Sequence, residues 1–353
     1  MLSTIKIGNF RIGKDKPTFI IAEGGVNHNG KLDLAKKIID HAVRCGANCV
    51  KFQTFKTESL LTESAPKAKY QLKTTDPKET QYFMLKKLEL KSSYYKKILN
   101  YCKKKKILFL STPYNIEDVD FLDRLGISAF KLSSMHAAEP SFVRYVASKG
   151  KPIILSTGMA TLEEINRTLK EVKKTKNKKI ILLQCTSNYP SLLQDTNLLA
   201  MKTIAKKFNV IVGYSDHTQN NIAAVVSIGL GAKVIEKHFT LNKLMKGPDH
   251  TTSANPKEFK NLVRNIRDAE KVLGTHIKKP SKIEKQNALG IKRSIVSKVD
   301  IKRKTKIMEK MLTFKRPFTG IKPALIDKVV GCYSKVDLPS NKIIKWSYLT
   351  KKK

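Results

Sequence analysis

The chain has 353 residues, 41% of them hydrophobic, and a formal net charge of +40 at pH 7. This length allows a large core and two domains. No apolar run is long enough to cross a membrane, so we expect no membrane span. The first residues do not show the charged segment followed by an apolar segment that is typical of a signal peptide, so we expect no signal peptide. The five cysteines are scattered, without a C-x-x-C pair. They are typical of reduced thiols, which favours a cytoplasmic location.

The strong positive charge has two interpretations. It indicates either a surface that binds nucleic acid or another polyanion, or lysine-rich solvated helix faces with a few lysines that gather an anionic substrate. Lysine far outnumbers arginine, aromatic residues are only 7%, and no nucleic-acid-binding motif is present. We therefore favour the second interpretation and expect no nucleic-acid partner.

Eight short apolar segments recur in the first 240 residues, and nearly every one ends in a residue that can do chemistry. They are residues 19–23, 49–53, 107–112, 129–134, 153–157, 180–185, 210–215 and 234–238. Helical patterns fill the gaps, at residues 32–45, 93–104, 116–125, 141–148, 162–173, 198–207 and 222–230. This alternation predicts a (β/α)8 TIM barrel of the α/β class, with its site at the C-terminal strand ends. An open doubly wound sheet is the structural alternative.

Two segments depart from this repeat. Residues 55–92 form an insertion too long for a simple loop, which could either cover the substrate or be a surface excursion. A helix at residues 256–273 precedes a polar stretch. We expect a catalytic barrel over residues 1–275, a linker over 276–289, and a small, mostly β domain over 290–353.

His217 and His238 follow consecutive predicted strands, so we expect them to face each other at the rim of the barrel. Two imidazoles with open positions favour manganese, iron or zinc over magnesium. Asp216 and Asp249 are nearby groups that could fix a histidine tautomer. The alternative is that the two histidines are unrelated rim residues.

Lys51 and Lys131 lie inside the second and fourth predicted strands, where an ammonium is costly unless it meets an anion. Thr112, Ser134, Ser156 and Ser215 add hydroxyls at other strand ends. Together these groups could hold a phosphate and a carboxylate. A Schiff-base lysine is the mechanistic alternative.

Glu23 ends the first predicted strand and is a candidate acid, base or sugar-hydroxyl acceptor. In the loop that follows, loop capping is the alternative to a functional role for His28 and Asn29, and for His28 we favour it.

The ordered motifs Ala22-Glu-Gly-Gly-Val-Asn-His-Asn-Gly30, Val50-Lys-Phe-Gln-Thr54, Gly213-Tyr-Ser-Asp-His-Thr218, Glu236-Lys-His-Phe-Thr240 and Gly247-Pro-Asp-His250 resemble the sialic acid synthase family. Lys315-Arg-Pro-Phe-Thr-Gly-Ile321 is similar to the antifreeze-like (SAF, β-clip) module of those enzymes. The resemblance covers nearly the whole chain.

The resemblance implies a transferase that condenses phosphoenolpyruvate with an N-acylated mannose-type sugar, giving a nine-carbon ulosonic acid and phosphate. His217 and His238 match the metal ligands, and manganese is the usual ion. Glu23 and Glu236 are candidates for proton transfer. The residues that match phosphoenolpyruvate contacts are Lys51, Thr112, Lys131, Ser134, Ser156 and Ser215. Those that match sugar contacts are Gln53, Tyr189 and Asp249. Arg316 matches an arginine that reaches the other subunit's barrel and contacts the acylamino group, which implies a domain-exchanged homodimer.

Two loops depart from the family pattern. A Ser-Gly-acidic turn usually follows the position of Lys131, whereas this chain has Ser134-Met135-His136. We expect altered substrate contacts there, the alternatives for His136 being a new metal ligand or a solvent-facing position. Ser187 stands where one family form has asparagine, in a loop expected to contact substrate phosphate.

Three functional hypotheses follow. The leading one is an N-acetylneuraminate synthase that uses N-acetylmannosamine in its open-chain form. The alternative keeps the chemistry but uses a 2,4-diacetamido-2,4,6-trideoxy hexose, as a legionaminate or pseudaminate synthase. The third is a non-catalytic basic binding protein with the same fold.

Overall fold

The structure is a computed structural model that describes residues 4–352, and the chain divides after Gly274 into two compact units. Each unit is described by itself. No helix in the described range is both long and apolar enough to cross a bilayer.

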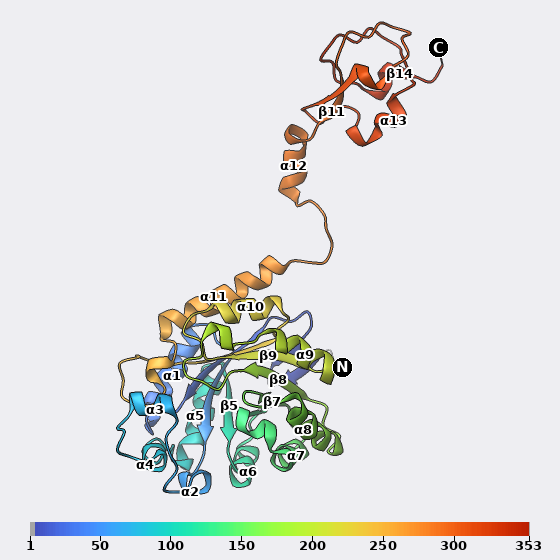
Figure 1. The fold of residues 1–353 in the computed structure, drawn as a ribbon. Helices are drawn as coiled ribbons and strands as arrows, with labels where there is room; N and C mark the ends of the chain where they lie inside the picture. Colours follow the sequence, from blue (N-terminus) through green and yellow to red (C-terminus); the bar gives the residue numbers. More distant parts are fainter. Residues whose placement is uncertain (1–3, 353) are drawn as a thin grey trace. The chain divides into compact units, whose positions relative to one another are not determined.

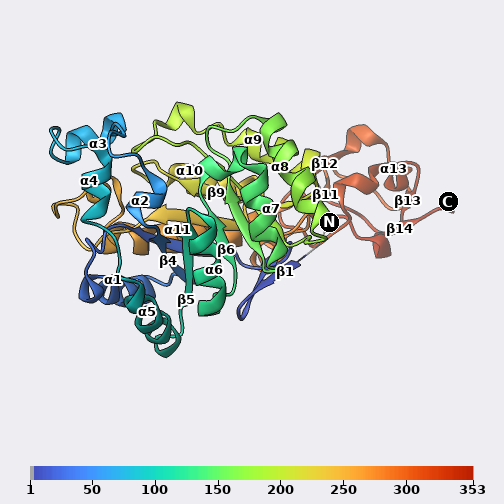
Figure 2. The same ribbon diagram turned by 90° about the horizontal axis from the view of Figure 1, so that it is seen from below.

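Eight parallel strands of the first unit form the barrel that the sequence predicts (Figures 1 and 2). Along the sheet their order is β5-β4-β3-β10-β9-β8-β7-β6, and β5 and β6 approach each other at the remaining seam. The predicted fold class is therefore confirmed. The strands are β3 (Phe19–Gly25), β4 (Cys49–Thr54), β5 (Leu108–Pro113), β6 (Phe130–Leu132), β7 (Ile153–Ser156), β8 (Ile180–Cys185), β9 (Ile211–Asp216) and β10 (Val234–His238).

Helices cover the outside of the barrel because each carries one apolar stripe, as in α8, which buries Ile165, Leu169 and Val172. That helix begins at a capping box formed by Thr161 and Glu164. The covering helices are α1 (Leu32–Arg44), α5 (Ser92–Lys104), α6 (Ile116–Leu125), α7 (Pro140–Ser148), α8 (Leu162–Lys174), α9 (Leu199–Phe208), α10 (Ile222–Gly229) and α11 (Pro256–Leu273).

The N-terminal end of the barrel is filled by an antiparallel hairpin of β1 (Thr4–Ile7) and β2 (Phe10–Gly13). Ile5, Ile7 and Ile12 pack there with inward-facing strand residues such as Ile21 and Ile181. Because this end is packed with apolar side chains, the polar side chains inside the barrel lie toward the opposite, C-terminal end.

The insertion at residues 55–92 folds into α2 (Thr57–Leu60), α3 (Lys69–Thr74) and α4 (Gln81–Lys86). Its buried Lys67 donates hydrogen bonds to Thr75 Oγ1 (2.9 Å) and Asp76 O (2.6 Å) and pairs with Glu79 (3.2 Å). Thr74 Oγ1 donates to Pro248 O at 3.1 Å, in the segment after β10. The insertion is thus internally braced and attached to the rim at the C-terminal strand ends.

The second unit has its own small core, centred on Ile295, Ile307, Val329 and Ile344. Its elements are α12 (Lys282–Ile291), β11 (Ser294–Ser297), β12 (Leu312–Lys315), α13 (Ile326–Val329), β13 (Tyr333–Ser334) and β14 (Leu349–Thr350). The strands pair antiparallel as β11–β12 and β13–β14. Helix α12 occupies much of the stretch expected to be a linker, because Ser281 and Glu284 form a capping box at its start.

Candidate active site

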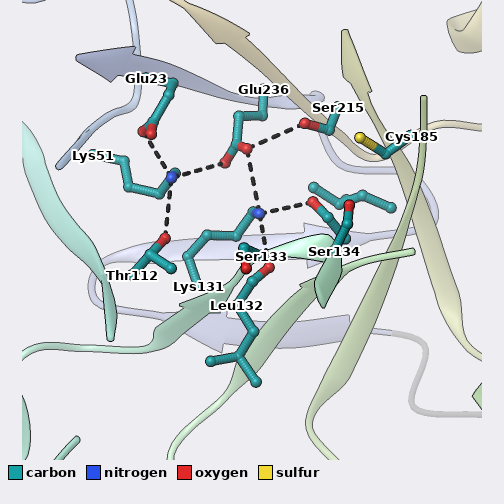
Figure 3. A network of polar contacts seen from close by, with 12 residues as sticks. Glu23, Lys51, Thr112, Lys131, Leu132, Ser133, Ser134, Cys185, Ser215 and Glu236 are labelled. Carbon is teal, nitrogen blue, oxygen red and sulfur yellow. Dashed lines mark hydrogen bonds and ion pairs between the residues drawn. The ribbon is translucent and has the colours of Figure 1, made fainter. Parts of the chain in front are cut away.

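Two lysines and two glutamates form a buried charged network inside the barrel (Figure 3). Lys51 Nζ lies 2.8 Å from Glu23 Oε2 and 4.0 Å from Glu236 Oε2. Lys131 Nζ lies 3.3 Å from Glu236 Oε1. The sequence predicted that these strand-end residues would share a site, and the structure brings all four together.

The strand register explains this convergence. Glu23 on β3 is aligned with Lys51 on β4, and Glu236 on β10 is aligned with Ser215 on β9. Side chains alternate between the two faces of a strand, so residues at equivalent register on neighbouring strands project from the same face of the sheet, here into the barrel. Ser215 Oγ accordingly donates to Glu236 Oε1 at 3.2 Å.

Burial and the neighbouring lysines together shift the pKa values of the two carboxyl groups in opposite net directions. Burial raises the pKa of Glu23 to about 7, although Lys51 partly opposes this. Burial also acts to raise the pKa of Glu236, but Lys131 and Lys51 together outweigh it and hold that pKa below its ordinary value. One carboxyl can therefore carry a proton near neutral pH while its neighbour stays ionised.

The pKa values of the two lysines are also shifted in opposite net directions. Burial lowers the pKa of both ammonium groups, but Glu23 and Glu236 more than compensate at Lys51, whose pKa is raised. At Lys131 burial prevails and the pKa is lowered. The ion pairs with Glu23 and Glu236 favour the charged form of Lys51, which is not the neutral amine that a Schiff base requires, and Glu236 opposes the effect of burial at Lys131.

Hydroxyl groups surround the lysines as the sequence predicted. Lys51 Nζ donates to Thr112 Oγ1 at 3.1 Å, and Lys131 Nζ donates to Ser156 Oγ at 2.8 Å. Ser134 lies beyond the end of β6, in the 3-10 turn η1 (Ser134–Ala138), where its Oγ accepts from Gly158 N at 3.0 Å.

The hydroxyl groups of Ser187 and Ser134 both lie close to Gly158. A Cβ placed on Gly158 would lie 2.4 Å from Ser187 Oγ and 2.9 Å from Ser134 Oγ. Two hydroxyls therefore crowd a position that only a glycine can occupy, and they form a polar cradle beside the lysines.

His217 and His238 face each other with ring centroids 5.4 Å apart, and the Tyr189 ring lies 4.1 Å from the first and 5.3 Å from the second. His217 Nδ1 lies 2.7 Å from the carbonyl oxygen of Thr186. A carbonyl only accepts, so Nδ1 carries a proton, and in the neutral imidazole the lone pair lies on Nε2. The two histidines are thus brought together as predicted.

The donor set fits a transition-metal ion with open positions. His238 Nδ1 is buried without a hydrogen-bond partner among the described residues, and Asp249 Oδ2 lies 3.9 Å from it. No cluster of three or more potential protein ligands occurs within residues 4–352. A metal here would have the two imidazoles as its protein ligands, leaving positions for substrate or water.

A pocket of about 290 Å³ opens above the network. From the barrel it is lined by three residues predicted to contact the sugar, Gln53, Tyr189 and Asp249, together with His238. From the insertion it is lined by Leu60, Leu61, Tyr70, Gln71, Gln81 and Leu85. The insertion therefore covers the site, which decides between its two interpretations.

The two residues after Lys131 that depart from the family pattern, Met135 and His136, lie in different surroundings. His136 is fully buried, its ring is stacked on Phe142 with centroids 4.6 Å apart, and its Nδ1 lies 3.1 Å from Ser133 Oγ. It is neither a metal ligand nor solvent-facing, so both alternatives were wrong, because the ring fits an aromatic slot behind the turn. Met135, in contrast, is 39% exposed and lines the pocket.

The loop after β3 behaves as the sequence indicated. His28 Nδ1 accepts from Gly30 N at 3.0 Å and is buried against Phe52, with ring centroids 5.3 Å apart. Burial lowers its pKa to about 3, so it is a neutral structural residue.

Arg316 belongs to the second unit and is exposed. Its loop is fixed by Ser294, whose Oγ donates to Pro317 O (2.7 Å) and accepts from Thr319 N (3.1 Å). The predicted contact between Arg316 and a substrate therefore stays a prediction.

Sequence reasoning missed Tyr70, Tyr114 and the leucines of the insertion as pocket residues. Tyr70 packs on Tyr189 with ring centroids 4.9 Å apart. Tyr114 directly follows β5, and the others lie in or next to the short helices α2, α3 and α4, which are too short for a periodic pattern, so only the tertiary fold shows which of them face the site.

Comparisons with known proteins agree with this geometry. The NeuB family model matches residues 38–278 and the SAF domain model matches residues 292–350. The chain is 45% identical to the N,N'-diacetyllegionaminic acid synthase of Campylobacter jejuni over 90% of this chain and 95% of that protein. It is 41% identical to the enzyme of the same name from Legionella pneumophila, over 96% of each chain. It is also similar to the structure of N-acetylneuraminic acid (sialic acid) synthetase from Leptospira borgpetersenii, with 33% identity, 80% and 94% coverage and a TM-score of 0.72. This chain is a member of the NeuB family, with a SAF domain at its C-terminal end.

Proposed function

We propose that this protein is a carbon–carbon bond-forming transferase that condenses phosphoenolpyruvate with a 2,4-diacetamido-2,4,6-trideoxy hexose, as an N,N'-diacetyllegionaminic acid synthase does. Relatives with that name are 41–45% identical to the chain, whereas the sialic acid synthetase structure is 33% identical. They favour the second acceptor considered from the sequence over N-acetylmannosamine. A non-catalytic binding protein is less well supported, because the buried charged network is complete.

The single observation that carries the proposal is the pair of buried lysines beside two imidazoles at one end of the barrel. Phosphoenolpyruvate brings a phosphate and a carboxylate, and Lys51 and Lys131 would offset these charges. The hydroxyls of Thr112, Ser156 and Ser215, and the cradle of Ser134 and Ser187, would accept or donate around them. Buried cations are stabilised by such anionic partners.

His217 and His238 would hold a divalent metal, with manganese as the proposed ion, and a bound metal supplies Lewis-acid polarisation of the sugar aldehyde. The Asp249 carboxylate, Tyr189 and Gln53 would orient the sugar beside the histidines. In the reaction, carbon 3 of phosphoenolpyruvate bonds to the aldehyde carbon. Water adds at carbon 2, and the phosphate leaves with cleavage of its carbon–oxygen bond.

Glu23 and Glu236 would handle the protons of this sequence. Glu23 can exchange a proton near neutral pH, since its pKa is about 7, whereas the low pKa of Glu236 keeps it anionic. We assign proton transfer to Glu23, and to Glu236 the role of a fixed negative charge that aligns both ammonium groups.

The test is phosphate release by the purified full chain with phosphoenolpyruvate, manganese and one acceptor at a time. The acceptors are 2,4-diacetamido-2,4,6-trideoxymannose, its pseudaminate-type isomer and N-acetylmannosamine. We expect metal-dependent release, abolished by a chelator, and a nine-carbon product by mass spectrometry. Absence of phosphate release with all three sugars would overturn the proposed reaction.

We further propose a domain-exchanged homodimer in which Arg316 serves the barrel of the partner copy, as the resemblance implies. Mixing two inactive variants, Arg316→Ala and Lys51→Met, after reversible dissociation tests this. Exchange would restore activity, because the intact barrel of one chain would receive the intact arginine of the other. No recovery in verified mixed dimers would contradict it.

A further inference from the structure

Gln53, His238 and Asp249 form a polar part of the pocket lining, here called its polar end, and Met135, Leu60 and Leu85 form an apolar part. We propose that Met135, together with Leu60 and Leu85, forms an apolar subsite for the far end of the acceptor sugar, and that Met135 is a specificity-determining residue. The subsite would take a methyl-terminated carbon chain and a second acetyl group. This inference rests on the proposed function, which leaves open how acceptors are distinguished.

The polar end of the pocket is fixed by the barrel. His238 and Asp249 lie next to the end of β10, and Gln53 Nε2 lies 3.5 Å from Glu23 Oε1. The aldehyde of an open-chain sugar must lie at this end, because the network and the histidine pair are there.

The opposite end is apolar and firmly packed. Leu60, Leu85 and Tyr114 pack against a buried cluster of Val26, Phe55 and Leu88. The bracing of the insertion by Lys67 and its bond to Pro248 hold this wall in place. A rigid apolar wall can discriminate between ligands because it cannot rearrange to offer a hydrogen-bond partner to an added hydroxyl group.

The length of the acceptor sugar and the polarity of its two ends match the polar and apolar ends of the pocket. Five carbon–carbon bonds of about 1.5 Å carry the sixth carbon of an extended hexose about 6 Å from the aldehyde. A sugar bound by its aldehyde at His238 therefore projects its distal carbons toward the insertion. In the trideoxy sugar that end is a methyl group, whereas in N-acetylmannosamine it is a hydroxymethyl group.

One amide on the insertion suits the second acylamino group. Gln81 Nε2 donates to Gln71 Oε1 at 3.0 Å, and Gln71 Oε1 also accepts from Ala68 N at 3.0 Å. This arrangement orients the Gln81 side chain and leaves its carbonyl to accept an amide N–H. A 4-acetamido group supplies that N–H together with an acetyl methyl for the leucines.

Met135 is placed in the pocket by the residue that follows it. His136 is buried on Phe142 and bonded to Ser133, which locks the η1 turn. With the next side chain anchored behind the turn, Met135 faces the pocket. A glycine at this position, as in the family pattern, would leave that part of the wall without a side chain.

The expected preference for one acceptor sugar over the other can be given a lower limit. An apolar pocket rejects a ligand that carries one additional hydroxyl by about 10- to 100-fold. We therefore expect the full chain to favour the diacetamido-trideoxy sugar over N-acetylmannosamine by at least about tenfold in kcat/KM.

The experiment compares kcat/KM for these two sugars in the wild type, Met135→Gln, Met135→Leu and a control, Met308→Gln. Met308 has a similar exposure, 43% against 39%, but lies in the second unit. Met135→Gln should reduce the sugar preference about tenfold through the KM of the sugar, while the KM of phosphoenolpyruvate stays the same. Met135→Leu and Met308→Gln should keep the preference.

The outcomes separate the two proposals. Turnover of both sugars with equal efficiency by the wild type, or an unchanged preference in Met135→Gln, would overturn the subsite and leave the reaction class intact. Phosphate release with neither sugar would overturn the proposed function itself. A melting temperature that matches the wild type shows that Met135→Gln is folded. If it does not fold, the preference of the wild type still decides, because a ratio below about tenfold overturns the subsite.

Discussion

Lys237 Nζ lies 2.7 Å from Asp216 Oδ2, and each of these buried residues directly precedes one of the paired histidines. The ammonium also donates to Thr218 O at 2.6 Å and to Asn220 O at 3.2 Å. This ion pair joins the ends of β9 and β10 on the side away from the charged network. It therefore fixes the strand ends from which His217 and His238 project.

Breaking this ion pair should strongly destabilise the barrel. Lys237→Met leaves the Asp216 carboxylate buried and unpaired, so we expect the free energy of unfolding to fall by about 3–5 kcal/mol. Chemical denaturation followed by circular dichroism measures it. The matched control is Lys243→Met, which breaks the more exposed pair with Glu258 (2.8 Å) and should cost about 0–1 kcal/mol. Equal losses in the two variants would contradict this explanation.

Loss of either paired histidine should abolish metal binding in the barrel. We expect His217→Gln and His238→Gln each to lower the affinity for manganese about 100-fold or more, because no larger group of potential ligands lies within residues 4–352 to replace a lost imidazole. Calorimetric titration of the metal-free protein with manganese provides a readout that does not depend on turnover. His276→Gln, at an exposed site, should bind like the wild type. Unchanged affinity in both pocket variants would place the metal elsewhere.

Glu23 should produce a limb in the pH profile near neutrality. Burial raises its pKa to about 7, so the carboxyl is largely protonated at pH 6 and largely ionised at pH 8. We expect kcat/KM to change around pH 7 in the wild type. Glu23→Gln should lose that limb together with about 100-fold or more of the activity. If Glu23→Gln keeps a limb at the same pH, another group is responsible.

The raised pKa of Glu23 has a consequence for stability with a definite sign. The folded state holds this proton more tightly than the unfolded state, whose carboxyl has the ordinary value of 4.5. Its contribution to stability is therefore complete below about pH 4.5 and is lost as the pH rises through about 7. The stability of Glu23→Gln relative to the wild type should increase over that interval, which denaturation at several pH values measures.

A methyl group on Gly158 should damage the polar cradle. The new Cβ would overlap Ser187 Oγ and Ser134 Oγ, so both hydroxyls must move. We expect Gly158→Ala to raise the KM of phosphoenolpyruvate about tenfold or more, the cost of losing one or two hydrogen bonds to a charged group. Gly229→Ala is the matched control. Its Cβ meets nothing within 4 Å at the end of α10, so activity should stay unchanged. An unchanged KM in Gly158→Ala would exclude this cradle from substrate binding.

The barrel and the two buried lysines could be predicted because both depend on local patterns. Each apolar segment was followed by a helical stripe, and parallel strands direct their carboxyl ends to one face. Lys51 and Lys131 stood out since an ammonium inside an apolar strand needs a partner. The sequence did not identify those partners as Glu23 and Glu236, because pairing depends on the register between strands that are distant in the chain.

The remaining features depend on tertiary packing that has no sequence period. His136 looked like a polar loop residue, yet the Phe142 ring gives it a buried slot. The insertion could not be oriented from its sequence, since the bonds made by Lys67 and Thr74 decide which leucines face the site. The hairpin of β1 and β2 was missed because two four-residue strands are too short for a reliable alternation pattern.

The hairpin of β1 and β2 limits where molecules can enter and leave the barrel. Ile5, Ile7 and Ile12 close one end of the cylinder with side chains that exclude water. In the proposed reaction, the reactants and products would therefore enter and leave at the opposite end, where the insertion lines the pocket. The reactant that binds at the ammonium groups lies deeper than the one that binds beside the leucines. Under the proposed function we therefore expect the deeper molecule to bind first, because a sugar bound first would block its entry.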